Sequence, residues 1–141
     1  MRRLVRRALV AWELVRAVPP MVFIELSLRM SDLPTTCRRL GLALDLDSGV
    51  PAASQAVVLA GRSRRVLRGA LIVASHWPAG DTCLRRSLLL GHRLRRSGPV
   101  LRIGVKRGSD GAFVAHSWLE LDGATFDPSA VDFAVLGSVG R

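Results

Sequence analysis

Three side chains that could carry out acyl-transfer chemistry lie in the second half of this 141-residue chain: Cys83, His116 and Asp127. A thiolate can attack an amide carbonyl, an imidazole can move the thiol proton, and a carboxylate can hold the imidazole in one tautomer. The chain order of cysteine, histidine and aspartate matches these roles. Such residues occur in most chains of this length, so the elements that carry them decide whether they can meet.

Cys83 is predicted on the first turn of a helix over about residues 82–97, which is rich in leucine and ends in arginines followed by glycine and proline. Unpaired N–H groups and the helix dipole favour a thiolate at this position. Asp81 or Thr82 would be the N-cap. Asp81 is also a nearby negative charge that opposes thiolate formation.

One face of this helix carries only small side chains, because Cys83, Ser87 and Gly91 follow one another at intervals of four residues. A strand could approach the helix closely along that face, as a helix-on-sheet active site would require. Ordinary close packing would explain Ser87 and Gly91 equally well.

His116 and Asp127 are predicted on a β-hairpin, with strands over about 112–121 and 124–127 joined by Asp122-Gly123. In this register Asp127 lies diagonally across from His116, at a Cα separation of about 7–8 Å. Glu120 is about 13 Å from His116 along the strand. The geometry therefore prefers Asp127 as the orienting carboxylate, although a loop of odd length would turn it to the opposite face. The alternative is that the three residues have only structural roles.

The first half of the chain is predicted to be helical. Residues 2–18 form an amphipathic helix that ends at two prolines, and shorter helices cover about 21–31 and the segment from Asp32 or Thr35 to Gly41. We interpret the apolar face of the first helix as covering the core, with a membrane surface or a partner as alternatives. That face consists of Leu4, Val5, Ala8, Leu9, Trp12 and Val15.

A turn-rich stretch over 45–54 is the best candidate boundary, so we expect an N-terminal helical region over 1–54 and a catalytic core over 55–141. The core would begin with a helix over about 55–74. A strand over 100–106 precedes the hairpin. We expect an α+β fold in which the helix that carries Cys83 packs on a small antiparallel sheet.

The composition excludes a spanning segment, because charged residues interrupt every apolar run well before the roughly 20 residues that a spanning helix requires. The apolar region that export would need is also broken, so a cytoplasmic location with free thiols is expected. The formal charge is +10, and residues 61–107 hold 12 of the basic residues against one acid. Such a stripe attracts nucleic acid, anionic lipid or an acidic peptide without choosing among them, although a genome rich in arginine codons would also produce it.

Several motifs together resemble the peptidase of lasso peptide biosynthesis, a transglutaminase-like cysteine protease. The motifs are GDTCLRRSLLL at 80–90, LRRSG at 94–98, IGV at 103–105 and AHSWLE at 115–120. The resemblance is close over about 80–127 and loose in the N-terminal part. Two departures are Ser117, where the family usually has alanine, and the polar segment 91–93.

The resemblance implies a papain/transglutaminase-like core in which Cys83 is the nucleophile, His116 the base and Asp127 the third member. It implies removal of the leader from a ribosomally made precursor peptide, after which an ATP-dependent lasso cyclase closes the ring. Residues 1–79 show no convincing β-hairpin, so we expect the split form, which depends on a separate leader-recognition protein. No cofactor, metal or nucleic acid partner is expected, and a peripheral membrane contact of the Arg-rich helices is left open.

Two rival functions remain from the residues. Transfer of the acyl group to an amine would use the same catalytic residues. A non-catalytic basic helical protein that binds nucleic acid or an anionic membrane would use none of them. Cys37 is expected to be a structural thiol, because no neighbouring cysteine or histidine gives metal-ligand spacing.

Overall fold

The computed structural model describes residues 2–136. Within these residues, four α-helices precede or flank a small mixed sheet, and two 3-10 turns complete the chain. The helices are α1 (Arg2–Met30), α2 (Leu33–Leu40), α3 (Gly61–Ser75) and α4 (Cys83–Arg93), and the 3-10 turns are η1 (Arg95–Ser97) and η2 (Pro128–Asp132). The strands are β1 (Ala43–Asp45), β2 (Val100–Arg107), β3 (Phe113–Leu121), β4 (Ala124–Thr125) and β5 (Ala134–Val135).

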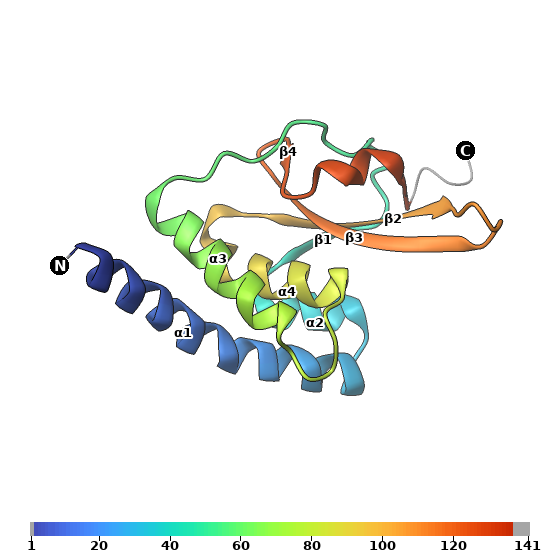
Figure 1. The fold of residues 1–141 in the computed structure, drawn as a ribbon. Helices are drawn as coiled ribbons and strands as arrows, with labels where there is room; N and C mark the ends of the chain where they lie inside the picture. Colours follow the sequence, from blue (N-terminus) through green and yellow to red (C-terminus); the bar gives the residue numbers. More distant parts are fainter. Residues whose placement is uncertain (1, 137–141) are drawn as a thin grey trace.

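Strand β2 is the centre of the sheet. It pairs in parallel with β1 and antiparallel with β5 along one edge, and antiparallel with β3 along the other. Strand β4 pairs with β3 only at the last two residues of β3. The part of β3 that carries His116 therefore lies at the edge of the sheet. Helices lie on one side of the sheet, and η2 and the segment after β1 lie on the other (Figure 1). The predicted α+β class is confirmed, but the sheet is mixed and not antiparallel throughout, because β1 pairs in parallel with β2.

The main core lies between α4, its helical neighbours and the sheet. Its fully buried members include Met21 and Ile24 of α1, Leu88 and Leu89 of α4, and Leu119 of β3. A Cβ built on Gly91 would lie 2.7 Å from Leu42 Cδ1 and 3.3 Å from Leu119 Cδ2. Gly91 therefore permits close packing of α4 against Leu42 and against the Leu119 side chain of β3, and ordinary close packing explains this glycine.

Helix α1 continues through Pro19 and Pro20, so the prediction that the first helix ends at the prolines is wrong. Proline at position 20 has no N–H to donate to the carbonyl of Arg16, four residues earlier. Arg93 Nη1 approaches that carbonyl at 3.5 Å from α4. Burial of Ala17 and Met21 on both sides of the prolines holds the segment helical.

The face of α1 predicted to cover the core is exposed, with Leu4 69%, Trp12 57% and Val15 64% accessible. The prediction is wrong because the helix packs through a different stripe. That buried stripe consists of Glu13, Ala17, Met21, Ile24 and Ser27. Because two of its members are polar, this buried stripe is a weaker hydrophobic pattern in the sequence than the exposed face.

The helix predicted from residue 55 begins only at Gly61, and residues 46–60 cross the far side of the sheet instead. Backbone hydrogen bonds attach this segment to β4, from Thr125 N to Gln55 O at 2.7 Å and from Val57 N to Thr125 O at 2.8 Å. Strands β1 and β5 were not predicted. The division of the chain at residue 54 stays a prediction.

Both acidic residues of α1 are paired with arginines of α4. Glu13 binds Arg93, and Glu25 accepts from Arg85 Nε at 2.8 Å. The hydrogen bond from Arg85, with a smaller contribution from Arg29, outweighs burial and lowers the pKa of Glu25 to about 2. Part of the basic stripe in the middle of the chain therefore serves to attach α1 to the helix that carries Cys83.

Replacing Glu25 with glutamine is expected to reduce stability in a pH-dependent way. Because its folded-state pKa is below the ordinary value of 4.5, the stabilisation is fully present above pH 4.5 and is lost as pH falls toward 2. Urea midpoints of the two proteins should differ at pH 7 and converge near pH 2. A difference that stays constant from pH 7 to pH 2 would contradict this assignment.

Candidate active site

Cys83 is the first residue of α4, and Thr82 rather than Asp81 is its N-cap. Thr82 Oγ1 accepts from Arg85 N at 3.3 Å. The backbone N–H groups of Cys83 and Leu84 have no intrahelical acceptor at this helix end, and no described residue accepts from them. Two free donors and the positive end of the helix dipole therefore lie next to the thiol.

Asp81 does not cap the helix, and its carboxylate is paired with Arg86. Its Oδ1 accepts from Arg86 Nε at 2.8 Å, and this bond lowers the pKa of Asp81. The bond likewise raises the pKa of Arg86 against the effect of burial, and the charges of Cys83 and Asp127 add to that rise. Arg86 therefore offsets the negative charge of Asp81 beside the thiol.

The hairpin has the predicted turn and register next to the turn, but the returning strand predicted over 124–127 ends at Thr125. Leu121 pairs with Ala124 and Glu120 with Thr125. Asp122 and Gly123 have φ values of 51° and 74°, as a type I′ turn requires. After Thr125 the chain leaves the sheet, and Asp127 becomes the N-cap of η2.

The two carboxylate oxygens of Asp127 have separate partners. Oδ2 accepts from His116 Nε2 at 2.6 Å, and Oδ1 accepts from Ser129 N at 2.9 Å and Ser129 Oγ at 2.7 Å. Burial favours the neutral acid, but the bonds from Ser129 and His116 outweigh it and lower the pKa of Asp127. A charged Asp127 keeps the proton on His116 Nε2, which leaves Nδ1 as the basic nitrogen.

The ring of His116 is also held by aromatic contacts. Its centroid lies 4.8 Å from that of Phe133 and 6.1 Å from that of Trp118. No described residue forms a hydrogen bond with Nδ1. One ring nitrogen is thus fixed by Asp127 and the other is free for a proton transfer.

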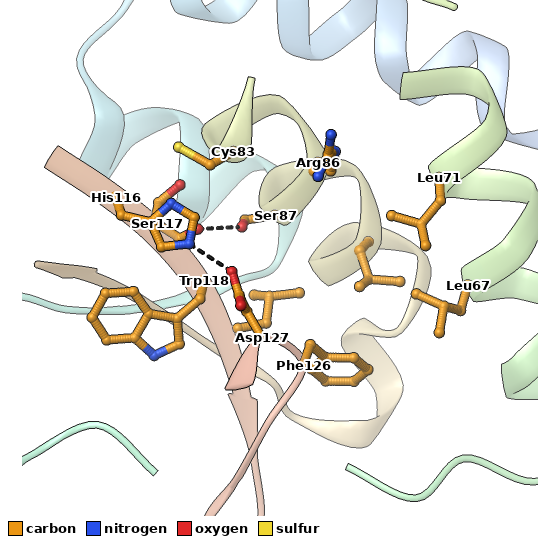
Figure 2. A pocket seen from close by; sticks show the side chains of 12 residues that line it. Leu67, Leu71, Cys83, Arg86, Ser87, His116, Ser117, Trp118, Phe126 and Asp127 are labelled. Carbon is orange, nitrogen blue, oxygen red and sulfur yellow. Dashed lines mark hydrogen bonds and ion pairs between the residues drawn. The ribbon is translucent and has the colours of Figure 1, made fainter. Parts of the chain in front are cut away.

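One cavity of about 330 Å³ brings the three predicted residues together. Figure 2 shows Cys83, His116 and Asp127 at its polar end and Phe126, Leu67 and Leu71 at its apolar end. Cys83 and His116 are not hydrogen-bonded among the described residues, and such contacts often tighten only when a substrate binds.

The structure separates these residues from the other candidates. Glu120 is occupied elsewhere, because its Oε1 accepts from Trp118 Nε1 at 2.9 Å and its Oε2 pairs with Arg102 at 3.2 Å. Cys37 is buried, and burial raises the pKa of its thiol to about 11, as expected for a structural cysteine.

The sequence analysis did not identify two residues that contribute to the site. Ser129 holds the second oxygen of Asp127, and the run Asp127-Pro128-Ser129 carries a recognisable capping signal, an aspartate directly before a proline. Arg86 lies in the cavity wall and pairs with Asp81, which the spacing of five residues did not indicate.

Ser117 lines the same cavity and is 5% exposed, and its Oγ has no partner among the described residues. A neighbouring hydroxyl is satisfied, since Ser87 Oγ donates to the carbonyl of Ser117 at 3.2 Å. The two serines therefore form a matched pair in which one hydroxyl contributes a hydrogen bond and the other does not.

Substituting alanine at these two positions is expected to change the free energy of unfolding differently. Ser87→Ala removes a buried hydrogen bond and should lower the free energy of unfolding by about 1 kcal/mol, whereas Ser117→Ala should leave it unchanged or raise it by up to ~1 kcal/mol. Denaturant unfolding measures both. Equal losses of stability in the two variants would contradict the assignment of a hydrogen bond to Ser87 and of none to Ser117.

The chain belongs to the transglutaminase-like superfamily, whose family model matches residues 21–137. The helix-on-sheet arrangement described above fits the papain-like core expected for this class, so the predicted fold is confirmed. Members of the superfamily are commonly cysteine peptidases or acyl transferases. Comparisons with curated proteins and with solved structures gave no match.

The described residues contain no cluster of histidine, cysteine and acidic side chains that could hold a metal ion. None of the helices in residues 2–136 combines the length and the apolar character needed to cross a bilayer.

Proposed function

We propose that this protein is a cysteine peptidase that removes the leader peptide from a ribosomally synthesised lasso precursor. The observation that carries the proposal is the cavity in which Cys83, at the start of α4, faces the same space as the hydrogen-bonded pair of His116 and Asp127. Membership of the transglutaminase-like superfamily supports thiol chemistry at this position. The four motifs over 80–120 support the particular substrate.

In the proposed first step, His116 Nδ1 takes the proton from the thiol of Cys83, and the sulfur attacks the carbonyl carbon of the scissile amide. The oxygen of that carbonyl becomes negatively charged and accepts from the free N–H groups of Cys83 and Leu84. The C–N bond then breaks, and the imidazolium gives its proton to the leaving amine. The products are the core peptide, with a free amino terminus, and the leader as a thioester on Cys83.

In the second step His116 Nδ1 takes a proton from water, and the resulting hydroxide attacks the thioester carbon. The sulfur leaves, and the proton held by His116 returns to it, so the enzyme regains its starting state. Asp127 keeps the proton of Nε2 in place in both steps and stabilises the imidazolium that forms between them.

A separate leader-recognition protein and an ATP-dependent lasso cyclase are the proposed partners. Residues 1–79 contain helices and the three-residue strand β1, and no hairpin that could accept a leader as an added strand within its described part. Recognition by a second protein would compensate for this. The free amino terminus of the core peptide is the group that ring closure consumes.

The test is reconstitution of cleavage with a lasso precursor, with and without a candidate leader-recognition protein. We expect a single cut between leader and core, and a higher kcat/KM when the recognition protein is present. Equal rates in both cases would refute the split arrangement. Absence of any cut would refute the proposal that a lasso precursor is the substrate.

Acyl transfer to an amine is distinguished in the same assay. With a primary amine added, the proposed peptidase should still release mainly the free leader acid. A leader that carries the amine as its main product would assign the protein to the transferases instead.

A further inference from the structure

The outward side of α1 is a long apolar surface that the rest of the chain does not cover. Its large apolar side chains are between 40% and 81% exposed, and they recur every three or four residues from the first turn to the last. We call this set the outer face of α1. It consists of Leu4, Val5, Leu9, Trp12, Val15, Val18, Val22, Phe23, Leu26 and Met30.

The charges of α1 are sorted between its two sides. The two acids, Glu13 and Glu25, turn toward α4 and have side chains only 9% and 12% exposed. The exposed charged side chains described on α1 are all arginines: Arg7, Arg16 and Arg29. A surface that hides its acids and exposes cations beside apolar groups is complementary to a surface that is both anionic and apolar.

Arginines also gather in a cavity at the edge of the outer face. Arg16 lines this cavity of about 300 Å³ together with Arg62 of α3, Arg95 and Arg96, and the paired side chains of Glu13 and Arg93 form another part of its wall. Arg16, Arg62, Arg95 and Arg96 are exposed, and none of them has a carboxylate partner among the described residues. Guanidinium groups in such a cluster fit phosphate oxygens with paired hydrogen bonds.

The position of α1 suits a flat surface. The helix runs along one margin of the molecule, with α3, α4 and the sheet all on its other side (Figure 1). A helix of 29 residues is about 43 Å long at 1.5 Å per residue. The outer face can therefore lie in a plane along its whole length without moving the domain above it.

We propose that the outer face of α1 binds the surface of a membrane that contains anionic phospholipids, with the helix parallel to the bilayer. The apolar side chains enter the boundary between headgroups and acyl chains, and the arginines contact lipid phosphates. A second copy of this chain is a poorer occupant, because a symmetric contact would bring the exposed arginines of two helices together. This inference does not depend on the peptidase activity.

The test is co-sedimentation of the full chain with vesicles of phosphatidylcholine, alone or mixed with phosphatidylglycerol. We expect binding to the mixed vesicles that weakens as salt rises, and a blue shift of tryptophan emission from Trp12, which is 57% exposed in solution. Val15→Glu combined with Val22→Glu should weaken binding by at least ~10-fold, since both side chains lie on the outer face. The matched control is Val58→Glu, at a residue 91% exposed on another segment, which should bind as the wild type does.

A second variant tests the lipid charge. Arg62→Ser with Arg96→Ser should reduce the preference for mixed vesicles over phosphatidylcholine. The thermal unfolding midpoints of both double variants should stay close to that of the wild type, which shows that they fold. Binding that is absent, or equal in wild type and Val15→Glu/Val22→Glu, would overturn the proposal. A dimer in sedimentation equilibrium that the same variant abolishes, without vesicle binding, would assign the outer face to a second copy instead.

Discussion

Replacing Cys83 with alanine is expected to lower kcat for leader removal by at least about 10⁴-fold while leaving the fold intact. The thiol lies beside the free N–H groups at the start of α4, and it is only partly buried. Alanine keeps the helix start, because the cap is made by Thr82. Mass spectrometry of the precursor over time measures the effect, and thermal unfolding verifies the fold.

Cys37→Ala is the matched control for this prediction. It also removes a thiol, but one that is 1% exposed in the core. Its cost should appear in stability, at roughly 1 kcal/mol or more for a buried cavity, and not in kcat. Cleavage that persists in Cys83→Ala would end the catalytic assignment.

His116→Ala is expected to lower kcat by about 10²–10⁴-fold, because proton transfer to and from the sulfur and the leaving amine would lose its base. The substitution leaves a space between Asp127 and the ring of Phe133, 4.8 Å from the lost imidazole. Added imidazole should therefore restore part of the activity. An unchanged rate, or a loss that only accompanies unfolding, would contradict the role of His116.

Asp127→Asn extends the same prediction to the third residue. The carboxylate serves two donors with two oxygens, His116 through Oδ2 and Ser129 through Oδ1. An amide has one oxygen, so it either loses the Ser129 cap or presents its NH₂ to Nε2 and reverses the tautomer of His116. We expect a loss of about 10²–10⁴-fold in kcat. Glu120→Gln is the control, since the contacts of Glu120 are with Trp118, Arg102 and the backbone N–H of Ala53, and its loss should affect stability alone.

The hairpin and the helix start were predictable because local rules determine them. Asp122-Gly123 specifies a two-residue turn, and the turn determines which residues of β3 and β4 share a face. That register alone favours Asp127 over Glu120 as the partner of His116. The first-turn position of Cys83 follows equally from local sequence, whereas the sequence left the cap open between Asp81 and Thr82 and the structure assigns it to Thr82.

The features that could not be predicted depend on contacts between distant segments. Helix α1 continues through Pro19 and Pro20 because the residues beside them are buried and Arg93 approaches the carbonyl of Arg16. None of these contacts is visible in the local sequence. Strand β1 has three residues and exists only because β2 lies beside it. Residues 55–60 have a helical pattern, yet they pair with Thr125 across the far side of the sheet.

The outer face of α1 illustrates the limit of hydrophobic periodicity. The strongest apolar stripe of this helix is the exposed one, whereas the buried stripe includes Glu13 and Ser27. An acid becomes acceptable inside only because Arg93 is present on α4 to pair with it. Periodicity located the helix but selected the wrong side as the core.

The central claim is that Cys83 carries the leader as a thioester, and rapid acid quenching followed by intact mass measurement tests it most directly. With wild-type protein, precursor and recognition protein, we expect a transient species heavier than the enzyme by the leader acyl group, located on Cys83 by digestion. The species should be absent in Cys83→Ala and should decay as free leader appears. Release of the leader by wild-type enzyme with the adduct on another residue would contradict the account.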